Sequence, residues 1–120
     1  MKKALIIEDH PDMLDVLSRQ LEMLGFAVIT ASNGEDGVEK AIGENPDLIL
    51  MDIMMPGMGG REATRRIRSN PMSKDIPILA TTVLFRESEL NKCIEAGCND
   101  YIVKPFTQKQ LASRIERLLM

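Results

Sequence analysis

Three acidic residues and one lysine stand where short apolar runs of the sequence end. The three carboxylates are of a type that binds a cation. Glu8 and Asp9 follow one run, Asp52 follows a second and Lys104 follows a third. Three carboxylates cannot cheaply share one site as free anions, so a bound cation is needed to offset their repulsion. Oxygen ligands alone favour Mg²⁺ or Ca²⁺, and Mg²⁺ usually keeps waters and a substrate phosphate among its ligands. These residues therefore predict a Mg²⁺ site that also accepts a phosphate group.

A threonine hydroxyl and the lysine supply further groups that stabilise a phosphoryl group during its transfer. Thr81 and Thr82 end another apolar run, and their spacing to Lys104 favours Thr82. Period-two alternation along a strand places Thr81 on the opposite face. Carboxylate, Mg²⁺, lysine and hydroxyl together stabilise the charge on a phosphoryl group in transfer. Because a carboxylate is also a competent nucleophile, Asp52 could form an aspartyl phosphate.

Apolar runs alternate with amphipathic stretches along the chain, and this alternation predicts the elements that position these residues. Strands are expected at residues 4–7, 26–30, 48–51, 77–82 and 101–103. Helices are expected over Leu14 to Leu24 with Gly25 closing it, from Ser32 to Asn45, from about Glu62 to Ser69, from Glu87 to Ala96 and after Thr107. Ser32 and Glu35 have the spacing of a capping box. Unbroken apolar strands that alternate with helices indicate an α/β fold with a doubly wound parallel sheet of five strands. The carboxyl ends of its strands would form the functional crevice.

Length, charge and hydropathy restrict the class of protein. A chain of 120 residues supports one domain, and a net charge of −3 without blocks of like charge argues against nucleic-acid binding. No apolar run approaches the roughly 18 residues that a membrane span needs, and the run after Lys3 is too short for a signal peptide. We therefore expect a cytoplasmic protein without membrane insertion. Cys93 and Cys98 are expected to be reduced, because they lack histidine partners for zinc and point in different directions.

Four segments resemble the signatures of response-regulator receiver domains of two-component systems, chemotaxis-type single-domain regulators included. They occur in the family's order and spacing, and they span essentially the whole chain: Ile7-Glu8-Asp9, Leu50 to Pro56, Ala80-Thr81-Thr82 and Tyr101 to Phe106. The resemblance implies a flavodoxin-like sheet of order 2-1-3-4-5 with five helices. It also implies that residues 1–120 form one receiver domain. Because the chain ends where an output domain would begin, we expect none.

The resemblance implies specific roles for the residues at the metal site. Asp52 corresponds to the phosphoacceptor. Glu8, Asp9 and Asp52 would hold Mg²⁺, with the backbone carbonyl of Met54 as a further ligand. The family also implies that the peptide bond before Pro105 is cis, a conformation largely confined to X-Pro bonds.

The resemblance further implies how the domain receives and transmits a signal. A histidine kinase or histidine phosphotransfer protein would donate the phosphoryl group from phosphohistidine to Asp52. Lys104 would pair with the phosphoryl oxygens, and Thr82 would move towards them. Tyr101, the aromatic switch, would then reshape the face built from the fourth helix, the fifth strand and the fifth helix. A downstream protein would read that face, so the domain signals and catalyses only its own phosphorylation and dephosphorylation.

Two residues depart from common family patterns close to the acceptor. The position after the switch threonine is commonly small, and here it is Val83. The position two residues past the acceptor is often polar, whereas Met54 cannot place an attacking water. Both differences predict a comparatively long-lived phosphoryl state.

A third departure concerns association between copies of the chain. In winged-helix transcriptional regulators, an acidic residue before the switch strand pairs with the equivalent of Arg114 across a dimer interface. Asn99 is expected at that acidic position, and Gln110 replaces a common Glu. These replacements argue against that dimer, so a monomer or a weak homodimer is expected.

Two other classes of protein remain as alternatives. An aspartate-nucleophile phosphatase usually carries a second Asp as general acid at the place of Met54, so this rival lacks its acid. A flavin-binding module would need a Ser/Thr/Gly phosphate loop after the first strand, where Glu8-Asp9-His10-Pro11 offers anions instead. His10 precedes Pro11 in a loop and is not assigned a catalytic role.

Overall fold

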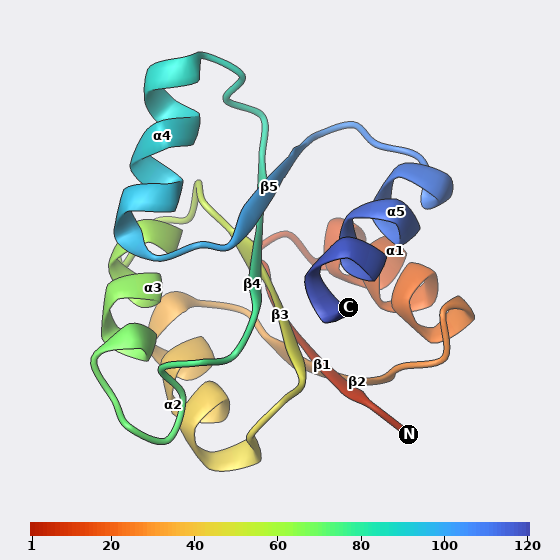
Figure 1. Ribbon diagram of the computed structural model, residues 1–120, viewed down its shortest axis with the longest axis horizontal. Helices are drawn as coiled ribbons and strands as arrows, with labels where there is room; N and C mark the ends of the chain where they lie inside the picture. Colours follow the sequence, from red (N-terminus) through yellow and green to blue (C-terminus); the bar gives the residue numbers. More distant parts are fainter.

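Five parallel strands form one sheet through the centre of the structure (Figure 1). This computed structural model describes all residues from 1 to 120. The strands are β1 (Lys3–Ile7), β2 (Ala27–Ala31), β3 (Leu48–Asp52), β4 (Ile78–Thr82) and β5 (Asp100–Val103). They lie in the order β2-β1-β3-β4-β5, which confirms the predicted doubly wound topology. Every residue of β3 and β4 is buried, as their unbroken apolar sequences predicted.

Five helices cover the two faces of the sheet (Figure 1). They are α1 (Pro11–Met23), α2 (Gly34–Glu44), α3 (Gly60–Arg68), α4 (Glu87–Ala96) and α5 (Gln108–Leu119). Leu17, Leu21, Leu111 and Ile115 bring α1 and α5 into one core layer, with Leu50 and Leu79 of the sheet. The other layer packs α2, α3 and α4 against the opposite face of the sheet. None of the helices combines the length and apolar character that crossing a bilayer requires.

The helix ends follow local backbone chemistry. Gly97 ends α4 with φ 119°, Gly25 follows α1 with φ 92°, and Asn45 ends α2 with φ 48°. These positive angles suit glycine and asparagine at helix C-termini, and they confirm the predicted ends. The expected cap at Ser32 is wrong by one residue. Asn33 caps α2, because its Oδ1 accepts a hydrogen bond from the N–H of Asp36.

The register of the parallel strands brings their carboxyl ends to one edge of the sheet. Ile7 pairs with Met51, and Asp52 pairs with Thr81. Thr82 in turn pairs with Val103. The residues that immediately follow β1 and β5 therefore extend beyond the same edge at which β3 ends. The predicted metal ligands, Thr82 and Lys104 belong to this edge or to the loops beside it, whereas Tyr101 lies inside β5 and pairs with Ala80.

Candidate functional site at the carboxyl edge of the sheet

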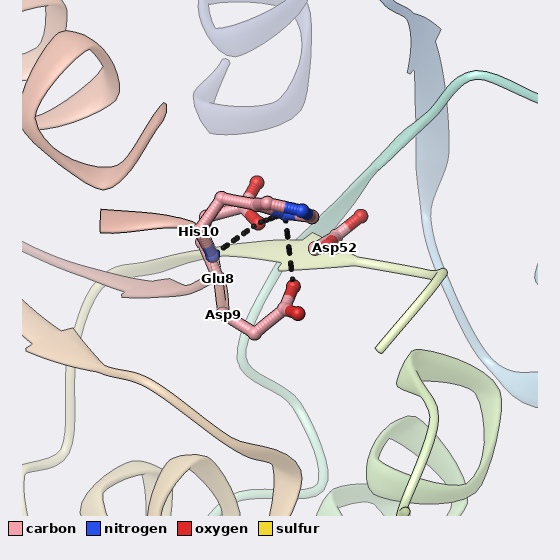
Figure 2. Close-up of side chains that lie close together, drawn as sticks. All are labelled: Glu8, Asp9, His10 and Asp52. Carbon is pink, nitrogen blue, oxygen red and sulfur yellow. Dashed lines mark hydrogen bonds and ion pairs between the residues drawn. The ribbon is translucent and has the colours of Figure 1, made fainter. Parts of the chain in front are cut away.

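Four potential metal ligands meet at the carboxyl edge, where β1 and β3 end (Figure 2). One ligand atom from each of Glu8, Asp9, His10 and Asp52 lies within 4.8 Å of the others. Glu8 is fully buried and Asp52 is almost so, whereas His10 is exposed. The structure thus brings the three predicted carboxylates together, and it adds a histidine that the sequence analysis did not include.

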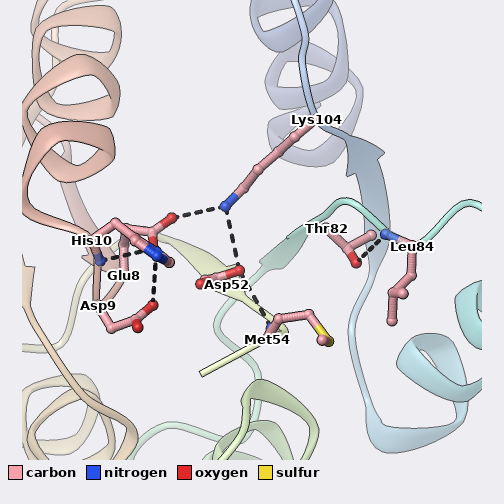
Figure 3. Close-up of polar contacts among 8 residues, drawn as sticks. All are labelled: Glu8, Asp9, His10, Asp52, Met54, Thr82, Leu84 and Lys104. Carbon is pink, nitrogen blue, oxygen red and sulfur yellow. Dashed lines mark hydrogen bonds and ion pairs between the residues drawn. The ribbon is translucent and has the colours of Figure 1, made fainter. Parts of the chain in front are cut away.

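Lys104, which follows β5, extends its side chain towards two of these carboxylates, those of Glu8 and Asp52 (Figure 3). Its Nζ atom lies 2.9 Å from Oε1 of Glu8 and 3.4 Å from Oδ1 of Asp52. The cluster holds three carboxylates but only one ammonium group, so it keeps an excess of negative charge when all are ionised. The peptide bond between Lys104 and Pro105 is cis, as the family resemblance implied.

Burial and the neighbouring charges shift the pKa values of the two buried carboxyl groups in opposite directions. Burial raises the pKa of Asp52 to about 7; the positive charge of Lys104 opposes this rise, and Glu8 adds to it. Burial also disfavours ionised Glu8, but hydrogen bonds from Lys104 Nζ and from the His10 N–H outweigh it and lower the pKa of Glu8. Asp52 is therefore the carboxyl group that holds a proton more readily when no metal ion is bound.

The residues present fit a divalent cation. Oδ1 of Asp9 is buried and accepts no hydrogen bond, so a polar ligand atom is left to be satisfied. Hard divalent cations take carboxylate oxygens as ligands, and Glu8 and Asp52 supply two more. At Met54 the N–H donates to Oδ1 of Asp52 over 3.4 Å. The role of the Met54 carbonyl remains a prediction.

The two threonines at the end of β4 are both buried, but their hydroxyl groups differ in their contacts. Oγ1 of Thr82 accepts a hydrogen bond of 3.0 Å from the N–H of Leu84, in the loop that leads to α4 (Figure 3). Oγ1 of Thr81 has no hydrogen-bond partner. The structure places no hydrogen bond between Thr82 and Asp52. Because the Thr82 hydroxyl only accepts from Leu84, its own hydrogen can still donate to another oxygen atom.

Tyr101, for which the family resemblance predicts a switch role, is the second residue of β5. Its ring is half-buried against the core layer under α2, α3 and α4. The guanidinium of Arg114 lies 5.9 Å from the ring centroid and also donates to the carbonyl oxygen of Tyr101. These contacts connect β5 to α5 at the surface.

The expectation that Asn99 stands at the acidic position of a dimer interface stays a prediction. Within the chain, both arginines of α5 pair with Asp100: Oδ1 lies 3.4 Å from Arg114, and Oδ2 lies 3.2 Å from Arg117. Asn99 instead accepts hydrogen bonds from Arg68 and from the N–H of Ile78. Asparagine there is explained by this bridge, because its amide oxygen joins α3 to the start of β4.

Proteins with known roles resemble this chain over its full length. The protein PilH of Pseudomonas aeruginosa is 36% identical over 99% of this chain and 98% of its own length. The transcriptional regulatory protein PhoP of Bacillus subtilis is 36% identical over 98% of this chain, which covers 48% of PhoP. The chain spans about half the length of several other curated regulators that it matches.

Solved structures agree with the sequence relatives. The chemotaxis protein CheY4 of Vibrio cholerae superposes with a TM-score of 0.94 at 29% identity, over 99% of both chains. The receiver domain of a sensor histidine kinase from Pseudomonas aeruginosa gives a TM-score of 0.92 at 33% identity over 98% of this chain and 97% of its own. That structure has a magnesium ion coordinated in its active-site cleft. The model of the response regulator receiver domain family matches residues 4–116. The chain therefore belongs to the response regulator receiver domain family of two-component signalling.

Proposed function

We propose that Asp52 accepts a phosphoryl group from the phosphohistidine of a histidine kinase or histidine phosphotransfer protein, with Mg²⁺ as cofactor. The observation that carries this proposal is the position of Asp52. Its side chain is 4% exposed, lies 3.4 Å from Lys104 Nζ and shares a corner with two further carboxylates. Such a buried carboxylate suits phosphoryl transfer, because the ammonium group of Lys104 and a bound metal ion would both offset the charge of the incoming group.

The two oxygens of Asp52 differ in a way that supports its role as a nucleophile. Oδ1 accepts hydrogen bonds from Lys104 Nζ and the Met54 N–H, whereas Oδ2 accepts none. Oδ2 would form the new P–O bond while the P–N bond of the donor breaks and its electron pair returns to the imidazole. Lys104 would then move to the phosphoryl oxygens. Mg²⁺, held by Glu8, Asp9, Asp52 and the Met54 carbonyl, would neutralise charge on those oxygens.

The signal would reach the surface through Thr82 and Tyr101. A phosphoryl group brings about −1.5 to −2 charges and acceptor oxygens to which the Thr82 hydroxyl would donate its hydrogen. Movement of Thr82 would change the space beside Tyr101 and so the face of α4, β5 and α5. A cavity of about 460 Å³ on this face, lined by Tyr101, Lys109 and Arg114 among others, gives a downstream protein a surface to bind. We place this signalling in the cytoplasm, with the domain as a monomer or weak homodimer.

Phosphoramidate tests the proposed transfer, because its P–N bond resembles that of phosphohistidine. Intact-mass measurement after incubation with Mg²⁺ should show the gain of one phosphoryl group in the wild type and none in Asp52→Asn. The gain should disappear when EDTA removes the metal ion. Equal gain in both proteins would reject Asp52 as the acceptor.

A further inference from the structure

His10 lies closer to the acidic cluster than its place in a loop suggests. Its Nδ1 atom lies 3.3 Å from Oδ1 of Asp9 and 3.4 Å from Oε2 of Glu8. Figure 2 shows the imidazole ring between these carboxylates and Asp52. The contact with Glu8 is a long hydrogen bond whose direction depends on the tautomer of the imidazole, and the contact with Asp9 is at ion-pair distance. The imidazole nitrogen is therefore a close neighbour of one oxygen atom from each carboxylate.

The separations match those between ligands of a single metal ion. Two ligand atoms that each lie about 2.1 Å from a metal, at the tetrahedral angle, are roughly 3.4 Å apart. Nδ1 of His10 keeps about this distance from Oδ1 of Asp9 and from Oε2 of Glu8, and the cluster's ligand atoms all lie within 4.8 Å of one another. Of these, Oδ1 of Asp9 is buried without a hydrogen-bond partner. The fourth position would face solvent or Asp52.

The backbone at His10 is held in place, which preserves this arrangement. His10 is the N-cap of α1 with φ −88° and ψ 116°, and Pro11 follows it as the first helical residue. A residue before proline is restricted to such extended conformations. The His10 N–H also donates to Oε2 of Glu8 over 3.2 Å. The side chain itself is 73% exposed, so an ion can reach its ring nitrogen from solvent.

We propose that His10, Asp9 and Glu8 form a mixed nitrogen–oxygen site for a divalent transition ion, with Zn²⁺ as the reference case. Imidazole favours Zn²⁺, Cu²⁺ and Ni²⁺, whereas carboxylate and water ligands favour Mg²⁺. The inference rests on the proposed function, because the two ions share Glu8 and Asp9. A bound transition ion displaces Mg²⁺ and so inhibits Mg²⁺-dependent phosphorylation of Asp52. The cluster then distinguishes two classes of metal through one residue.

The chain offers a direct test, because His10 is its only histidine. Tag-free, metal-free protein labelled with ¹⁵N on histidine gives imidazole signals from residue 10 alone. Zn²⁺ should shift the Nδ1 resonance by direct coordination, and excess Mg²⁺ should reverse the shift. If Zn²⁺ does not shift the Nδ1 resonance, the proposal is wrong. This holds even if Zn²⁺ binds elsewhere, for example at the cysteines.

Affinities give a second measurement. In calorimetric titrations with Zn²⁺ and Mg²⁺, the ratio of Zn²⁺ to Mg²⁺ affinity should fall at least about tenfold in His10→Gln. Asp12→Asn is the control, because Asp12 is exposed in the first turn of α1 and lies outside the cluster. Its ratio should match the wild type. An equal ratio in wild type and His10→Gln contradicts the proposal.

Failure of this inference and failure of the proposed function give different results. The same preparations are incubated with phosphoramidate and Mg²⁺ in the absence of Zn²⁺. Phosphorylation of Asp52 with an unmoved Nδ1 resonance rejects only the transition-metal site. A shifted Nδ1 resonance without any phosphorylation rejects the proposed function and leaves the metal site standing.

Discussion

The ammonium nitrogen of Lys104 lies 2.9 Å from Oε1 of Glu8, although the two residues are 96 positions apart in the chain. Glu8 is fully buried at that point and Lys104 is only 12% exposed. The same nitrogen lies farther from Asp52, at 3.4 Å. Lys104 therefore offsets the charge of one buried carboxylate while it remains within reach of the proposed acceptor.

Replacement of Lys104 by methionine should destabilise the protein at neutral pH. The change keeps most of the side-chain volume but leaves Glu8 and Asp52 without their shared cation, at a cost of roughly 2 kcal/mol in metal-free buffer. Urea unfolding at pH 8 measures this cost. Lys74→Met is the control, because Lys74 is exposed and its ammonium group makes no ion pair. Equal stability of the two variants would show that Lys104 does not compensate the buried carboxylates.

The raised pKa of Asp52 predicts how its stability contribution depends on pH. In the folded, metal-free protein the pKa is about 7, against 3.8 for an unperturbed aspartate. The folded state binds the proton more tightly, so the contribution is full below about pH 4 and is lost as pH rises through 7. Asp52→Asn removes this dependence. From pH 5 to pH 8 in EDTA, the wild type should therefore lose about 1–3 kcal/mol relative to Asp52→Asn. A difference that stays constant with pH would contradict the raised pKa.

Gly60 should tolerate no side chain, because it packs directly on the strand end that carries Asp52. A Cβ atom there would lie 2.8 Å from the Cα of Ile53 and closer still to the carbonyl oxygen of Asp52. Gly60→Ala should cost about 1–3 kcal/mol and slow phosphorylation, since the strand end must shift. Gly43→Ala is the matched control: a Cβ at Gly43 meets nothing within 4 Å in α2. It should stabilise by about 0.5–1 kcal/mol. Urea unfolding measures the free energy of unfolding of both variants. Equal values for Gly60→Ala and Gly43→Ala would contradict the predicted clash at Gly60.

Val83 and Met54 are predicted to prolong the phosphoryl state. Both side chains are more than half exposed, at 57% and 51%, and they belong to the two loops that follow β4 and β3. Val83→Ala together with Met54→Asn should admit and orient water, and raise the dephosphorylation rate about tenfold, or ~1.4 kcal/mol. The decay of phosphorylated protein, followed by intact mass after removal of the donor, measures the rate. An unchanged rate would show that these side chains do not protect the phosphoryl group.

Much of the fold and the cluster could be predicted from the sequence, because each strand is a short apolar run that ends in a distinctive polar residue. Asp52 and Lys104 followed from this pattern, and the parallel register explains why they meet. The cap of α2 was assigned to the wrong residue because Ser32 and Asn33 are both good caps. Only the backbone angles show that Asn33 holds the extended conformation of an N-cap.

Contacts between distant side chains could not be read from the pattern. The pairing of Asp100 with Arg114 within the chain was not predicted, because sequence spacing does not show which side chain of β5 turns towards α5. The closeness of the His10 ring to the acidic cluster was not predicted either. Its adjacency to Glu8 and Asp9 was a signal, but the direction of its ring depends on the turn into Pro11.

Reductive mapping of the phosphorylated residue tests the central claim most directly. Wild-type protein is phosphorylated with acetyl phosphate and Mg²⁺, treated with borohydride and digested, and the peptides are sequenced by mass spectrometry. Borohydride reduces an acyl phosphate to an alcohol, so a phosphorylated aspartate becomes homoserine. The account predicts homoserine at position 52 alone, and none without Mg²⁺. Homoserine at position 9, a phosphorylated His10, or no modified residue would contradict it.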